Sequence, residues 1–220
     1  MKTFHNLNFF IVLIFLSVSC TSSKPIAAKF NNEQRKGRDN SNQLFIVTND
    51  GVKITAKKLQ YQTRTSLFPT NNVNDKAVLL DGKKVEFGQY AAIQTSYAYK
   101  ILYTPENSSP KSKGIYISRL RSGKINLFHY EYASTEKNSW QKRMVYHEYY
   151  FQKENGQPET LNFENFGDVI RDNSKACDML VQLFPLGEIP KTDVKKTFKN
   201  LLAIVDLYNL PTTEYLQVHR

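Results

Sequence analysis

Two histidines and two glutamates lie close together in a tyrosine-rich part of the sequence. His129 and Glu131 belong to one expected strand, and His147 and Glu148 belong to the next. Imidazole and carboxylate groups are the usual ligands of zinc, so these residues could form a metal site. Alternate residues of a strand share a face, which places His129 with Glu131 but separates His147 from Glu148. At most three of the four could therefore meet, and polar positions within a sheet are the favoured interpretation.

The sequence contains no motif typical of nucleophilic catalysis or of cofactor binding. No serine lies in a Gly-x-Ser-x-Gly turn, and no His-Glu-x-x-His sequence is present. Cys177 stands between Ala176 and Met179 on an expected buried helix, where cysteine usually behaves as a small, inert apolar residue. Neither Gly-x-Gly-x-x-Gly nor Gly-Lys-Ser appears, so a nucleotide cofactor has no support. The sequence predicts no catalytic residue, no metal ligand and no cofactor.

Tyrosine is the remaining signal, because it is crowded into the expected strands. The residues concerned are Tyr90, Tyr97, Tyr99, Tyr103, Tyr116, Tyr130, Tyr132, Tyr146, Tyr149 and Tyr150. A tyrosine joins an apolar ring to a polar hydroxyl, which suits a surface that binds peptide or glycan. It equally suits the half-buried face of an antiparallel sheet, and this second interpretation is favoured.

Short runs rich in Val, Ile, Tyr, Phe and Thr predict strands from residue 44 onward. Asp-Gly pairs supply the positive φ angles of tight hairpins, which predicts a hairpin at Asp50-Gly51 and another at Asp81-Gly82. The first hairpin joins residues 44–48 to 52–60, and the second joins residues 77–80 to 83–87. Further strands are expected over residues 91–104, 114–119, 125–132 and 145–152.

After Pro158 the apolar residues follow a helical spacing. Three stripes result: Phe163, Phe166, Val169 and Ile170; Ala176, Met179, Leu180, Leu183 and Phe184; and Val194, Phe198, Leu201, Leu202, Val205 and Tyr208. Ser174 and Thr192 stand in N-cap positions, and Pro211 ends the last helix. Strands followed by helices predict one α+β domain over residues 43–210, with about six to eight antiparallel strands and two or three C-terminal α-helices.

The first 20 residues have the order of a secretory signal. Lys2 precedes an apolar run over residues 9–16, and small residues lead to Cys20. That run is shorter than the roughly 20 residues that cross a bilayer. A cysteine after Leu16-Ser17-Val18-Ser19 resembles the lipobox of lipoprotein signal peptidases, in the looser form of Bacteroidota. We predict a signal peptide over residues 1–19 and lipid attachment at Cys20, with a chance cysteine after an ordinary signal as the alternative.

Polar segments flank the predicted domain, and the chain as a whole is basic. Residues 20–42 are polar and aperiodic, which predicts a disordered tether, and residues 211–220 form a C-terminal tail. The formal charge of +10 would suit nucleic acid or anionic surfaces, but export argues against nucleic acid. The basic residues are also dispersed in pairs, as on solvated faces. We expect a lipid-anchored envelope protein at the outer membrane, with the periplasmic side favoured over the cell surface.

Several segments resemble a group of exported Bacteroidota proteins of unknown function. They are residues 49–54, 120–128, 149–153 with the turn at Gly156, 161–163 and 204–209, so the resemblance covers roughly residues 42–210. The chain departs from the group at Cys177-Asp178, where such proteins more often have Asp followed by Cys-Pro. The resemblance implies an exported protein with a β-rich domain and a helical tail, and it brings no known activity.

These observations predict a non-catalytic interaction or structural module that is tethered to the envelope and has an envelope protein or glycan as its partner. The alternative is a hydrolase acting on envelope glycan or peptide material. Converging His, Glu and Asp side chains in a cleft would favour the hydrolase. A flat aromatic face or an exposed sheet edge would favour the module.

Overall fold

A computed structural model describes residues 32–39, 43–61, 78–86, 88–105, 114–134, 144–154, 156–190 and 194–211. The predicted signal peptide, Cys20 and most of the C-terminal tail lie outside these residues. None of the described helices combines the length and the apolar character that crossing a membrane requires.

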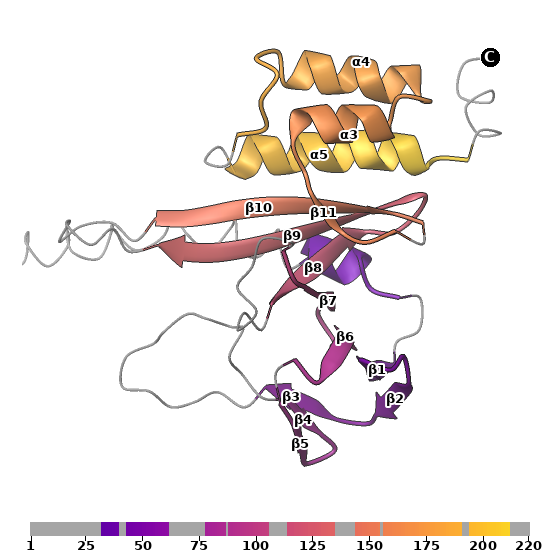
Figure 1. The fold of residues 1–220 in the computed structure, drawn as a ribbon, viewed down its shortest axis with the longest axis vertical. Coiled ribbons are helices and arrows are strands. Elements are labelled where there is room, and N and C mark those ends of the chain that lie inside the picture. Colours follow the sequence, from indigo (N-terminus) through magenta and orange to yellow (C-terminus); the bar gives the residue numbers. More distant parts are fainter. Residues whose placement is uncertain are drawn as a thin grey trace, which may run out of the picture.

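The described residues form an α+β fold, which confirms the predicted class (Figure 1). The strands are β1 Leu44–Thr48, β2 Lys53–Ala56, β3 Leu59–Tyr61, β4 Val78–Leu80, β5 Lys83–Val85, β6 Tyr90–Gln94, β7 Tyr99–Tyr103, β8 Ile115–Arg121, β9 Ile125–Ser134, β10 Met144–Lys153 and β11 Glu159–Thr160. The helices are α3 Phe163–Val169, α4 Ser174–Leu183 and α5 Val194–Asn209. Residues 32–36 form a further short helical segment.

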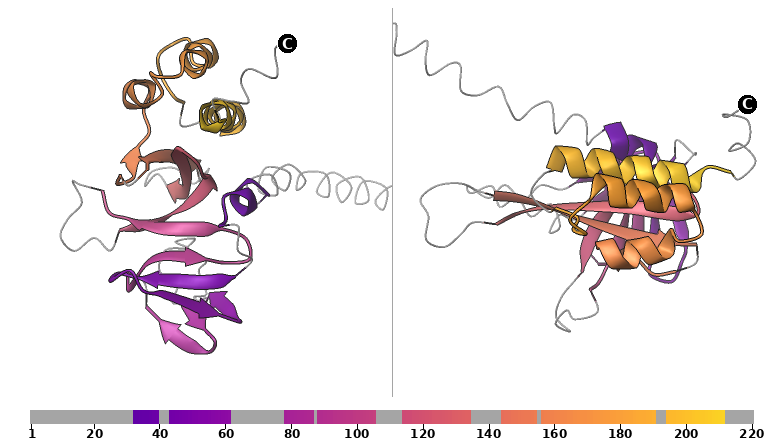
Figure 2. Two further views of the ribbon diagram at one scale, coloured as in Figure 1. Left: turned by 90° about the vertical axis from the view of Figure 1, so that its right-hand side faces the viewer. Right: turned by 90° about the horizontal axis from the view of Figure 1, so that it is seen from above.

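The strands build two antiparallel sheets. Eight strands form the large sheet in the order β11-β10-β9-β8-β7-β6-β1-β2, and β3, β4 and β5 form a small one. Figures 1 and 2 show the helices stacked over the β8–β10 end of the large sheet and the small sheet at the opposite end. Each end has its own buried cluster, so the large sheet connects two parts of the core.

Two segments that we predicted as single strands are each divided, and local hydrogen bonds explain both divisions. The segment 52–60 splits into β2 and β3 because the Asp81 carboxylate accepts hydrogen bonds from the Lys58 N–H at 2.7 Å and the Lys57 N–H at 3.3 Å. These bonds direct the chain into the small sheet. The segment 91–104 splits into β6 and β7 because the Thr95 hydroxyl accepts a bond from the Ala98 N–H at 3.0 Å, which closes a turn.

Both Asp-Gly hairpins form where we predicted them. Asp81 has φ +50° and Gly82 has φ +88°, the conformation that a tight hairpin requires at both central positions. The Asp81 carboxylate also fixes the start of β3, as described above. Asp81 is therefore a structural residue of the small sheet.

The predicted helical stripes pack on the large sheet. Phe166, Leu180 and Leu201 are buried against Phe151 of β10, in a cluster shared by all three helices. Helix α4 begins one residue earlier than we predicted, because Asn173 is its N-cap and accepts a bond from the Ala176 N–H at 3.1 Å. The Thr192 cap of the last helix lies outside the described residues.

Residues 32–39, which lie within the predicted tether, pack against β8. The Gly37 carbonyl accepts a hydrogen bond from the Arg119 guanidinium at 2.7 Å, and a Cβ at Gly37 would lie 2.0 Å from the Arg119 carbonyl oxygen. Arg121 pairs with Glu33 at 2.7 Å and also with Asp206 of α5. The polar composition suggested disorder, whereas two arginines of the sheet supply the partners that order this segment.

Candidate functional site

The two predicted histidines meet on the face of the sheet that carries the helices. His129 Nε2 and His147 Nδ1 are 2.8 Å apart, and the two rings are stacked. The ring of Tyr149, in β10, lies 5.4 Å from the His129 ring between centroids. The ring of Phe198, in α5, lies 6.3 Å from it. Both histidines are buried, so the pair belongs to the layer between sheet and helices.

Burial determines the charge state of this pair. It lowers the pKa of His129 from an ordinary value of 6.5 to about 3, with smaller contributions from His147 and Lys100, and it also lowers the pKa of His147. Both rings are therefore neutral at neutral pH. This state allows one ring nitrogen to donate to the other.

The two glutamates of the predicted constellation do not join the histidines in one site. Glu131 is exposed beside His147 in the β9–β10 register, whereas Glu148 lies on the opposite face, as strand alternation predicts. Among the described residues, no group of three or more His, Cys, Asp and Glu side chains is arranged to hold a metal.

Cys177 lies half-buried on α4. Its thiol donates to the Ile170 carbonyl oxygen at 3.3 Å. Burial raises the pKa of the thiol, and the nearby Asp178 and Asp172 carboxylates raise it further. A protonated thiol is a weak nucleophile, so this arrangement suits packing more than catalysis.

The tyrosines divide between different structural roles. Tyr90 and Tyr116 stack at 4.8 Å in the core beside the small sheet, where the Tyr116 hydroxyl donates to the Tyr90 carbonyl. Tyr149 lies under the helices. Tyr97 is exposed in the β6–β7 turn, with the Arg35 guanidinium 5.1 Å from its ring. Tyr90, Tyr116 and Tyr149 therefore belong to the core, and Tyr97 lies apart from the other tyrosines.

A second set gathers on the face of β9 and β10 that points away from the helices. We call Tyr130, Tyr132, Tyr146, Glu148 and Tyr150 the tyrosine cluster. Strand register places Tyr132 opposite Tyr146 and Tyr130 opposite Glu148. The Tyr132 ring stacks on Tyr130 at 5.8 Å and on Tyr146 at 5.4 Å. All members except the buried Tyr150 are partly exposed.

Glu148 lies at the centre of the tyrosine cluster. The Tyr150 hydroxyl donates to Glu148 Oε2 at 2.7 Å, and the Tyr132 hydroxyl also forms a hydrogen bond with this carboxylate. Burial and then Glu148 raise the pKa values of Tyr150 and Tyr132, so both hydroxyls remain protonated donors. Among the described residues, no basic side chain forms an ion pair with Glu148. The carboxylate is therefore held by neutral partners.

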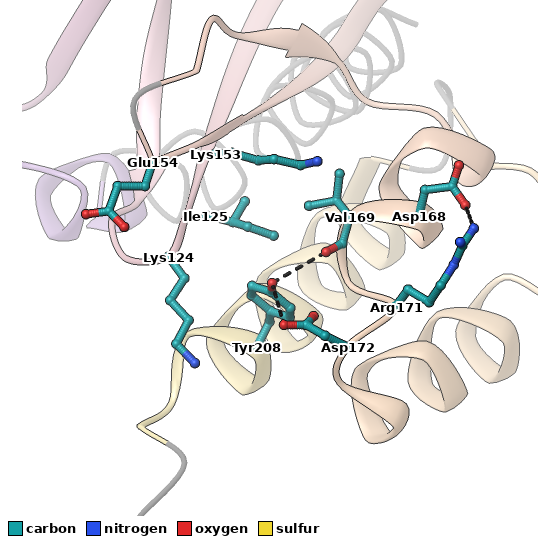
Figure 3. A pocket seen from close by; sticks show the side chains of 9 residues that line it. All are labelled: Lys124, Ile125, Lys153, Glu154, Asp168, Val169, Arg171, Asp172 and Tyr208. Carbon is teal, nitrogen blue, oxygen red and sulfur yellow. Dashed lines mark hydrogen bonds and ion pairs between the residues drawn. The ribbon is translucent and has the colours of Figure 1, made fainter.

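Surface pockets lie beside α3 and α5 and beside β7 and β11, and the first of these has balanced charge (Figure 3). It has a volume of about 570 Å³ and is lined by Lys124, Lys153, Arg171, Glu154, Asp168 and Asp172, together with Ile125, Val169 and Tyr208. Arg171 pairs with Asp168, and the Tyr208 hydroxyl bonds to the Val169 carbonyl and to Asp172. The three basic and three acidic side chains balance one another in number, so the pocket favours no ligand charge.

The second pocket is a groove of about 790 Å³ between the end of β7 and the segment that leads from β11 into α3. Its lining is mainly neutral, with Asn49, Thr104, Gln157, Thr160, Asn162 and Asn165 beside Leu102, Tyr103 and two prolines. Asn162 and Asn165 are already engaged in the capping box of α3. Tyr103 also packs on Tyr150 at 4.8 Å, which joins the groove to the tyrosine cluster.

Comparison of the chain with family models, with curated protein sequences and with solved structures finds no match. The geometry of the described residues therefore carries the functional argument. Sequence reasoning recognised the tyrosines but assigned Glu148 to a possible metal site. The alternation Tyr146-x-Glu148-x-Tyr150 beside Tyr130-x-Tyr132 is the pattern that indicates their common face.

Proposed function

We propose that this chain is a non-catalytic, lipid-anchored protein of the bacterial cell envelope that binds an envelope partner through the tyrosine cluster. The observation that carries the proposal is a group of partly exposed, mutually stacked tyrosines around a carboxylate that has no basic partner among the described residues. Tyrosine is enriched in protein interfaces because its ring supplies contact area while its hydroxyl forms hydrogen bonds. The signal and lipobox-like residues, and the resemblance to exported Bacteroidota proteins, support the envelope location.

The alternative, a hydrolase of envelope glycan or peptide, requires an acid and a base that reach one substrate atom. His129 and His147 are buried and neutral under the helices, while Glu148 lies on the other face of the sheet. These side chains cannot act on the same bond. The geometry therefore supports binding more than hydrolysis.

The binding proposal predicts that the tyrosine cluster determines which envelope components co-purify with the protein. The lipidated chain would be cross-linked in its own envelope and purified as wild type, as Tyr132→Ala/Tyr146→Ala and as Tyr97→Ala. We expect the double variant to lose specific components that the wild type and Tyr97→Ala retain, because Tyr97 is an exposed tyrosine outside the cluster. Equal recovery by all three proteins would contradict a binding role for the cluster.

The anchoring proposal predicts that Cys20→Ser prevents acylation and releases the protein from membranes. Several acyl chains, each contributing about 0.8 kcal/mol per buried methylene, hold a domain on a bilayer without a spanning helix. Fatty-acid labelling and membrane fractionation would measure the effect. Unchanged labelling and fractionation of the variant would show that Cys20 is not the attachment site.

A further inference from the structure

Glu148 is a partly buried acidic residue in a strongly basic protein. The chain has 30 Lys and Arg residues against 20 Asp and Glu residues. Glu33, the other partly buried acidic residue among those the structure describes, pairs with Arg121 at 2.7 Å. Glu148 has no such basic partner among the described residues, although it is partly removed from solvent. The two tyrosine hydroxyls that hydrogen-bond this carboxylate do not neutralise its charge, so a binding partner that supplies a positive charge would form a charge-assisted contact here.

The side chains around Glu148 also favour a cation. The face of an aromatic ring carries negative electrostatic potential, and tyrosine rings attract ammonium and guanidinium groups within about 6 Å. The Tyr130, Tyr132 and Tyr146 rings adjoin the carboxylate. Among the side chains that β9 and β10 place on this face and that the structure describes, Glu148 is the charged one. The described side chains of this face therefore offer a cation one carboxylate and several aromatic rings.

We propose that the tyrosine cluster binds a basic side chain of a partner protein, with the ammonium or guanidinium group on Glu148 and its alkyl stem along the Tyr132 and Tyr146 rings. This assignment rests on the proposed function and names the chemistry of its partner. Lysine and arginine have this form, since their long apolar stems cover aromatic surface while the head group pairs with a carboxylate. An anionic ligand would be repelled by Glu148, and a neutral glycan would leave its charge without a partner.

The full lipidated chain in detergent micelles would be titrated with the peptide acetyl-Gly-Lys-Gly-amide, and binding would be followed by NMR. The same peptide with an acetylated lysine has nearly the same shape without the charge. We expect the lysine peptide to bind at millimolar concentration and the acetylated peptide to bind about tenfold more weakly. Glu148→Gln should weaken the binding of the lysine peptide by a similar factor, because it removes the charge and retains a hydrogen-bond acceptor for Tyr150.

Glu131→Gln is the matched control, because Glu131 is exposed on the opposite face of the same strand pair. Its affinity for the lysine peptide should stay within about twofold of the wild type. An unchanged denaturation midpoint of Glu148→Gln would show that the variant is folded. If Glu148→Gln binds as the wild type does, or if the acetylated peptide binds equally well, the proposal is wrong.

A parallel titration with a tetramer of N-acetylglucosamine separates this proposal from the proposed function. Binding of the glycan that depends on Tyr132, without binding of the lysine peptide, would overturn the basic partner and leave the binding role of the cluster intact. Absence of lysine peptide binding up to about 10 mM would also overturn the basic partner. The proposed function itself would be contradicted by a different result: cluster variants that retain every envelope component that co-purifies with the wild type.

Discussion

Replacing Leu201 by alanine is expected to lower the free energy of unfolding by about 2–5 kcal/mol. Leu201 is fully buried on α5, in the cluster that joins the three helices to β8, β9 and β10. The substitution removes apolar contact and leaves a cavity that the surrounding side chains fill only in part. Chemical denaturation, followed by the far-ultraviolet signal of both helices and strands, would measure the loss.

Leu186→Ala provides the control, because the same atoms are removed from a side chain that is 89% exposed. Its unfolding free energy should change by less than about 0.5 kcal/mol. If Leu201→Ala unfolds at the denaturant midpoint of the wild type, the helices are a separate unit and do not share the core of the sheet. A single transition with a lower midpoint would show that sheet and helices unfold together.

Acidification from about pH 7.5 to about pH 5 is expected to destabilise the fold by about 2 kcal/mol through His129 alone. The folded protein holds the pKa of His129 at about 3, whereas the unfolded chain binds a proton near the ordinary value of 6.5. Between these values the unfolded state carries more protons, so stability falls as the pH falls. The effect fades as the pH rises above 6.5, where the unfolded chain also loses the proton. His147, whose pKa is also lowered, adds to the loss.

Denaturant midpoints measured across this pH range would give the slope. NMR titration of the imidazole ring would test its origin, since His129 should remain neutral at about pH 5. A ring that titrates near 6.5 in the folded protein would refute the assignment of the pH dependence to this pair. Glu131→Gln serves as a control. Partial burial raises the pKa of Glu131, so this carboxyl adds stability as the pH falls, and its removal should leave the loss due to His129 in place.

The sequence pattern was sufficient to predict the helices and turns, because these elements depend on interactions between residues that are near in the chain. Helical spacing identified Phe166, Leu180 and Leu201 as buried, and the Asp81-Gly82 turn forms as expected. The divided strands were missed because their bends depend on hydrogen bonds that backbone N–H groups donate to the Thr95 and Asp81 side chains, and these bonds compete with strand pairing. A continuous apolar run does not reveal such a bend, since period-two alternation resumes after it.

For the candidate site, sequence and tertiary structure contributed different parts. Strand alternation by itself separated His147 from Glu148. Only the register of β9 against β10 brought Tyr130 and Tyr132 to Glu148, and only the packing of α5 buried the histidine pair. The ordering of residues 32–39 by Arg119 and Arg121 likewise required the fold. Propensity and periodicity act between near neighbours in the chain, whereas pairing, burial and charge neutralisation depend on residues that only folding brings together.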